Sequence, residues 1–268
     1  MDYVCPGDFF YTDFNMPVED FVGLTQGTSC QVCPSLQPVI AWEDKRGLMK
    51  PENYRAAAVR YYAAGATGLS PYNYQYHWTG LVRPDHAEYA LMWPEALDFL
   101  SCLRDPEVLA IQNRHYLFHP LWAGHNEGHC PTGAYKDTRG YVDCSEVGAR
   151  GSFCFRMAED LGDPRLSATL QLEVTHMVAG EMLSISLNGQ HISAGEIRAQ
   201  EQPGQNQSGK ETGRPLGPFR LYTMPIQSPP AVIGDNELVV RLTKRVGMPV
   251  RMLGLEEVEV FVSVDDRP

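Results

Sequence analysis

The sequence lacks the features of several well-defined functional classes. No run of apolar residues approaches the roughly 18 that a membrane-spanning helix needs, so no membrane span is expected. The formal net charge is −11, which disfavours nucleic acid as a partner because phosphate neutralisation requires clustered Lys and Arg. No phosphate-binding loop, dinucleotide fingerprint or nucleophile elbow occurs, and we expect no cofactor. The first residues show no secretory signal.

The composition nevertheless favours packed domains. The chain has 268 residues, of which 43% are hydrophobic and 21% charged, enough for one large domain or two smaller ones. Residues 1–114 alternate short apolar runs with helical patterns that start near Pro17 and Pro51, which predicts about three βα units. Residues 151–268 alternate apolar and polar positions, which predicts a β-sandwich, and residues 115–150 are expected to be a linker.

Turn signals separate the strands expected in the second half. Asn188-Gly189 is typical of a tight hairpin turn. Gly234-Asp235-Asn236 predicts a turn before an edge strand. The polar, glycine-rich stretch Gln200–Arg214 predicts an exposed loop.

Several stretches of the first half resemble a known enzyme family. They are Asp2–Pro6, Val32–Leu36, Lys50–Ala58, Ala64–Gly68 and Tyr72–Tyr74. They are similar to the last third of family-10-like glycoside hydrolases, and this resemblance implies a partial (β/α) TIM-barrel segment over about 110 residues. The expected fold class is therefore α/β plus all-β.

The second half is similar to a galactose-binding-type jelly roll. The similarity is in Leu183–Gly189 and Gly234–Val240. Such sandwiches accompany glycosidases, so the resemblance implies a jelly-roll β-sandwich that accompanies a carbohydrate-active barrel. Both stretches also have a purely structural explanation as turns, and they indicate a fold better than a ligand site.

The length of the first half limits the barrel. An eight-stranded barrel needs about 250 residues, whereas about 110 precede the sandwich. We therefore expect an N-terminally truncated fragment of a parent that is secreted or periplasmic, although the sequence does not fix the compartment. The alternative is an open sheet completed by a partner chain. In either case the open sheet edge predicts self-association.

Ligands of parallel α/β folds bind where the strands end at their carboxyl side. Aromatic rings stack on sugar faces, and amides satisfy hydroxyl groups. A carbohydrate substrate or ligand is the expected partner. The alternative is that the aromatic loops pack against the sandwich. The expected binding residues are Phe9, Gln37, Tyr72, Asn73, Tyr74, Tyr76 and Trp78.

Two carboxylates are candidates for glycosidic hydrolysis. Such hydrolysis needs a pair of carboxyl groups about 5 to 9.5 Å apart, and Asp8 and Glu43 follow expected strands. Asp8 also fits a turn after Pro6-Gly7. Gln37 stands where the family resemblance implies a Glu nucleophile, which departs from the family pattern. The alternative function is a non-catalytic carbohydrate-binding or scaffolding protein.

No metal site is expected. Seven cysteines cannot all pair internally. Cys30 and Cys33 have the C-x-x-C spacing of redox and zinc motifs, but they lie in an apolar strand pattern and are interpreted as core thiols. His125–Cys130 contains metal-ligand residue types, but Gly128 and Pro131 favour a loop.

Overall fold

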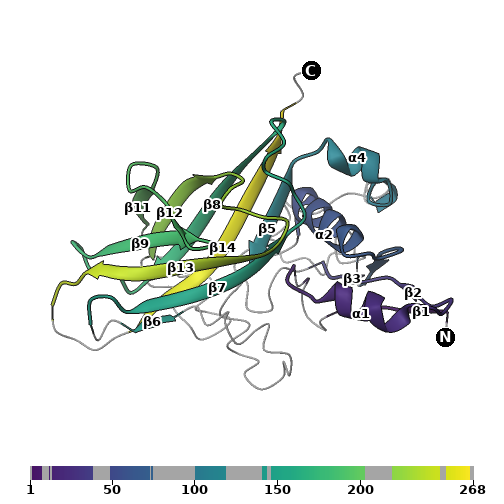
Figure 1. Cartoon of the computed structure of the whole chain (residues 1–268), viewed down its shortest axis with the longest axis horizontal. Helices are drawn as coiled ribbons and strands as arrows, with labels where there is room; N and C mark the ends of the chain where they lie inside the picture. Colours follow the sequence, from purple (N-terminus) through teal and green to yellow (C-terminus); the bar gives the residue numbers. More distant parts are fainter. Residues whose placement is uncertain are drawn as a thin grey trace. The chain divides into compact units, whose positions relative to one another are not determined.

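The computed structural model describes residues 2–7, 12, 14–38, 49–72, 74, 100–118, 141–143, 146–202, 219–247 and 252–265. These residues belong to two compact units, shown in Figure 1. The first unit covers the chain up to Tyr116, and the second extends from Leu117 to Asp265. The division falls within one strand, β5.

The first unit contains short strands and helices in alternation. Its described elements are β1 (Tyr3–Val4), α1 (Val18–Thr25), β2 (Gln31–Val32), β3 (Ser35–Leu36), α2 (Pro51–Ala63), β4 (Ser70–Pro71), α4 (Pro106–Ala110) and the start of β5 (Arg114–Phe118). None of the described helices is long and apolar enough to cross a membrane.

The two longer helices begin where the sequence predicts. Proline occupies the first position of α2, where its missing N–H costs nothing, and the Lys50 N–H donates to Asn53 Oδ1 at 3.0 Å. Gly27 and Gly65 follow the two helices with φ values of +76° and +95°, a left-handed conformation that favours glycine. The helix boundaries predicted near Pro17 and Pro51 are confirmed.

The short strands form two separate parallel pairs. β1 pairs with β2, and β3 pairs with β4. Backbone hydrogen bonds continue beyond each pair, so the segment 31–36 contacts the segment 2–6 on one side and 67–72 on the other. Pro34 interrupts the middle segment, and because proline has no N–H it cannot donate to a ladder.

The fold class predicted from the sequence, a partial TIM-barrel segment followed by a jelly roll, is wrong. The described residues are mainly β structure in four sheets with few helices, and the parallel strands are only two residues long. Short strands and helices alternate as the sequence predicts, but Pro6 and Pro34 have no N–H to donate between neighbouring segments, so the ladders lack hydrogen bonds at these positions. No continuous parallel sheet of barrel type results among the described residues.

The second unit consists of two antiparallel sheets (Figure 1). One has the strand order β10-β9-β13-β7, and the other has the order β11-β12-β8-β14-β5 with β6 also paired to β14. β5 and β6 lie in the stretch expected to be a linker. The remaining strands are β6 (Tyr141–Asp143), β7 (Arg150–Met157), β8 (Leu166–Thr175), β9 (Met182–Leu187), β10 (Gln190–His191), β11 (Arg198–Gln202), β12 (Phe219–Ile226), β13 (Gly234–Lys244) and β14 (Met252–Val264).

Alternating residues of both sheets are buried. In the larger sheet Leu170 pairs with Val260 and Leu172 pairs with Val258, and all four side chains are buried. The rings of Phe118 and Phe155 lie 5.3 Å apart between centroids. Burial of one face of each sheet is the arrangement of a β-sandwich, so the β-sandwich character expected for the second half of the chain is present.

The two turn signals have different outcomes. Asn188 and Gly189 have φ values of +49° and +78° and join β9 to β10, so the predicted hairpin turn is confirmed. Gly234-Asp235-Asn236, by contrast, is the first part of β13. This strand lies between β9 and β7, and the prediction of an edge strand is wrong.

Asn236 connects this strand to the turns around it. Its side-chain amide donates to the carbonyls of Val232 and Gly234, and its Oδ1 accepts from the Val232 N–H and from Asn188 Nδ2. The residue is 1% exposed. Removal of a buried side chain with this many partners leaves polar groups unsatisfied.

We expect Asn236→Ala to lower the free energy of unfolding of the sandwich by about 2–4 kcal/mol, because several buried hydrogen bonds are lost together. Urea denaturation followed by circular dichroism measures the change. Asp235→Ala is the matched control, because its side chain is 70% exposed and pairs with Arg156 at the surface; such pairs contribute at most about 1 kcal/mol. Equal effects of the two substitutions would contradict this account.

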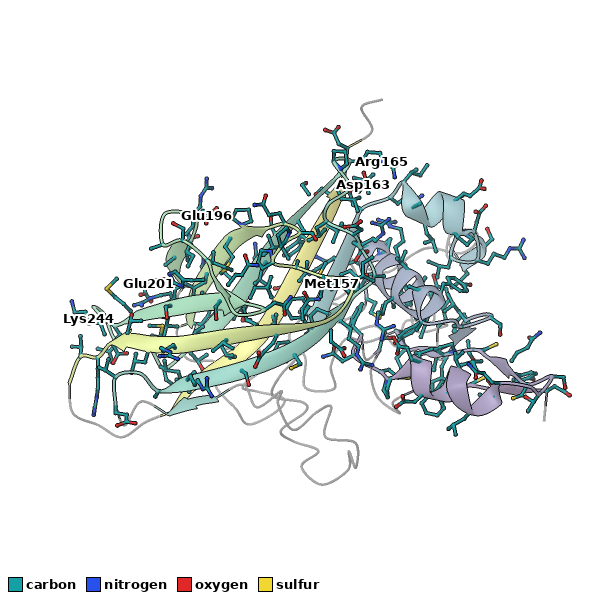
Figure 2. All side chains as sticks on the ribbon, viewed as in Figure 1. Met157, Asp163, Arg165, Glu196, Glu201 and Lys244 are labelled. Atoms are coloured by element: carbon teal, nitrogen blue, oxygen red, sulfur yellow. The ribbon has the colours of Figure 1, made fainter. Side chains whose placement is uncertain are left out.

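A surface ion pair predicts a measurable titration. Asp163 and Arg165 lie beside each other before β8 (Figure 2), 2.7 Å apart between Oδ2 and Nη2. Hydrogen bonds from Arg165 lower the pKa of Asp163 to about 2. The charged carboxylate is therefore favoured by folding, and this contribution is lost as the pH falls through that pKa. In an NMR titration Arg165→Gln should return the pKa of Asp163 toward its ordinary value; an unchanged midpoint would refute the assignment.

Candidate functional site

Gln37 and Tyr72 lie opposite each other where two parallel strands end. The register pairs Ser35 with Ser70 and Leu36 with Pro71, and the Tyr72 N–H donates to the Leu36 carbonyl at 2.9 Å. The same register therefore places Gln37 opposite Tyr72. The sequence predicted both as ligand-binding residues, and the structure brings them to one edge, which we call the Gln37–Tyr72 edge.

The two side chains differ in their access to solvent. Gln37 is 3% exposed, whereas Tyr72 is 45% exposed. An exposed tyrosine ring provides an apolar face and a phenol group, and a glutamine amide supplies both donors and an acceptor. The edge therefore combines a ring that a ligand can reach with a buried amide beside it.

Thr12 fixes the backbone of Gln37. Its hydroxyl donates to the Gln37 carbonyl at 3.0 Å and accepts from the Gln37 N–H at 2.8 Å. Both residues are buried. One hydroxyl group thus satisfies the donor and the acceptor of the same residue, which holds Gln37 at the strand end. Thr12 was not predicted, because the sequence carries no signal that relates it to a residue 25 positions later.

Tyr74, two residues after Tyr72, is buried. It is 4% exposed, and its ring packs edge-on against Tyr54 of α2 with 5.6 Å between centroids. Burial raises the pKa of Tyr74 and that of Tyr54, and for Tyr54 the neighbouring Tyr74 raises it further. Both phenols therefore keep their protons at neutral pH and can act as hydrogen-bond donors.

The other predicted site residues lie outside the part of the chain that the structure describes. They are Asp8, Phe9, Glu43, Asn73, Tyr76 and Trp78. His125–Cys130, interpreted as a loop, also lies outside it. Among the described residues there is no group of three or more His, Cys, Asp or Glu side chains that could hold a metal ion.

A charged cluster in the second unit was not predicted either. Arg220 of β12 forms an ion pair with Glu201 of β11, and its Nη1 donates to the Glu181 carbonyl at 3.0 Å. The Tyr222 hydroxyl donates to Met177 Sδ at 3.0 Å. Arg220 thereby connects two strands with the loop before β9, which is a structural role.

Comparisons with known proteins identify no family for this chain. No model of a protein family matches it, and no curated protein does. Solved structures that resemble it include BuGH86, a glycoside hydrolase in complex with neoagarooctaose, at 12% identity and a TM-score of 0.31. Another is dimeric latent PorU from Porphyromonas gingivalis, at 13% identity and a TM-score of 0.29.

These likenesses are partial. They cover 58% and 57% of this chain, but only 20% of BuGH86 and 13% of PorU. Similarity at this level carries no argument about fold or function. One of the two neighbours is a glycoside hydrolase, and nothing in the comparisons supports the family-10 resemblance specifically.

Replacing Thr12 tests how Gln37 is held. We expect Thr12→Val to speed hydrogen exchange of the Gln37 backbone amide at least about tenfold. Loss of the hydroxyl leaves buried backbone groups of Gln37 without a partner, which costs about 1–3 kcal/mol. Thr12→Ser keeps the hydroxyl and is the matched control. Protection of Gln37 that is the same in both variants would show that another group holds this backbone.

Proposed function

We propose that this chain binds neutral carbohydrate at the Gln37–Tyr72 edge. The observation that carries the proposal is the register of β3 and β4, which sets a half-exposed tyrosine ring opposite a buried glutamine amide. Sugar rings offer an apolar face and a rim of hydroxyl groups, and these two side chains match both.

The chemistry of the edge favours a neutral ligand. In this proposal Tyr72 stacks on a sugar face, and Gln37 is the neutral polar residue opposite it at the strand end. Neither side chain carries a charge, so a strongly charged ligand would lose its hydration without gaining an ionic partner from them.

A more specific version of the proposal is that the chain hydrolyses glycosidic bonds. Asp8 follows Gly7 in the chain. The Ser35 N–H donates to the Pro6 carbonyl, so the segment that contains β1 ends at the same edge. In this form Asp8 and Glu43 supply the two carboxyl groups that the reaction needs. The alternative is a non-catalytic binding protein, and self-association through the sheet edge stays a prediction.

We expect Tyr72→Ala to weaken binding of a neutral oligosaccharide about tenfold or more, since loss of a stacking ring removes its buried area and about 0.5–1.5 kcal/mol of ring contact in addition. Calorimetric titration against a panel of soluble hexasaccharides of glucose, xylose, mannose and galactose provides the measurement. Tyr3→Ala is the matched control, because Tyr3 is a 62% exposed tyrosine in the other parallel pair, β1–β2.

The outcomes separate binding from catalysis. Equal loss in the Tyr72 and Tyr3 variants, or no saturable binding of any hexasaccharide by the unaltered chain, would overturn the proposal. Release of shorter sugars that disappears in both Asp8→Asn and Glu43→Gln supports hydrolysis. Binding without release supports the non-catalytic alternative.

A further inference from the structure

Two cysteines far apart in the sequence lie opposite each other on neighbouring strands. β1 and β2 pair Tyr3 with Gln31 and Val4 with Val32. The Gln31 N–H donates to the Asp2 carbonyl, and the Cys33 N–H donates to the Val4 carbonyl at 2.9 Å. The second bond repeats the first two residues later, so the register continues and Cys5 lies opposite Cys33.

The side chains of this pair point to the same face of the ladder. One repeat further along, the Ser35 N–H donates to the Pro6 carbonyl, which sets Gly7 opposite Ser35. A Cβ built on Gly7 would lie 2.4 Å from the Ser35 Cβ, so these two positions direct their side chains toward each other. Side chains of a strand alternate with a period of two, and Cys5 and Cys33 therefore share that face.

The spacing of the strands suits a covalent bond between the sulfur atoms. Neighbouring strands lie about 4.7–4.9 Å apart, within the roughly 4.4–6.8 Å over which Cα atoms of disulfide-bonded cysteines are found. Cys30 differs in this respect. It lies three residues before Cys33 and so points to the other face, and it would pair in register with Asp2.

Neither cysteine of this pair is fully buried. Cys5 is exposed and Cys33 is half-buried, and neither is in a disulfide. A Cβ built on Gly68 would lie 3.2 Å from the Cys33 Sγ, so the lack of a side chain at Gly68 leaves room for this thiol. The Tyr62 ring of α2 lies near the same thiol, and its pKa is raised by burial and then by Cys33. Cys33 is therefore only partly buried, which corrects its interpretation as a core thiol.

We propose that Cys5 and Cys33 form a vicinal dithiol that closes to a disulfide on reaction with a small disulfide oxidant such as glutathione disulfide. The exposed Cys5 thiolate attacks one glutathione sulfur, and a glutathione thiolate leaves. The Cys33 thiolate then attacks the Cys5 sulfur of the mixed disulfide, and the second glutathione leaves. The two cysteine protons end on the two glutathione molecules, so two thiols are oxidised while one disulfide is reduced.

The test is peptide mapping by mass spectrometry after incubation of the full chain with glutathione disulfide. The expected result is a crosslinked peptide pair that contains Cys5 and Cys33, with the intact mass lower by two hydrogens. Cys30→Ser should leave the crosslink unchanged. Cys33→Ser should stop at the mixed disulfide of Cys5 with glutathione. Because the crosslink is mapped in the unaltered chain, the test does not depend on how the variants fold.

Several results would overturn the proposal. A crosslink between Cys30 and Cys33 would assign the C-x-x-C pair instead. Glutathione that stays on Cys5 in the unaltered chain would show that Cys33 cannot reach it. Absence of any reaction at Cys5 would remove the dithiol altogether.

Discussion

The hydrogen bonding of the segment 31–36 to strands on both sides is the constraint on which the first unit depends. On one side the register sets Cys33 opposite Cys5, and on the other it sets Gln37 opposite Tyr72. A shift by one residue in either ladder would turn each of these side chains to the other face. The proposed ligand edge and the proposed dithiol thus follow from one backbone arrangement, although they use different ends of it.

The second unit depends on its own interior instead. Its two sheets bury alternate side chains, and β8 and β14 pair over almost their whole lengths. Two polar side chains that enter this interior have several partners: Asn236 is bonded to the turns around β13, and Arg220 to Glu201 and the Glu181 carbonyl. These contacts stabilise the sandwich. The polar residues named here have structural roles in it.

Sequence patterns predicted local features well and long-range ones poorly. Helix ends at Gly27 and Gly65 and the hairpin turn at Asn188 follow from backbone preferences that a few neighbouring residues determine. The prediction of a barrel segment was wrong because an alternation of strands and helices in the sequence does not reveal whether the strands join into one sheet. The sequence predicted that Gln37 follows a strand. It could not predict that the Thr12 hydroxyl holds Gln37, because no sequence pattern relates these two segments.

An NMR titration of the labelled chain with the neutral hexasaccharides tests the central claim most directly. The account predicts saturable shifts of the Gln37 side-chain amide and the Tyr72 backbone amide with one common dissociation constant, because the register places both at one edge. Saturable shifts confined to the sandwich strands, with Gln37 and Tyr72 unmoved, would contradict it.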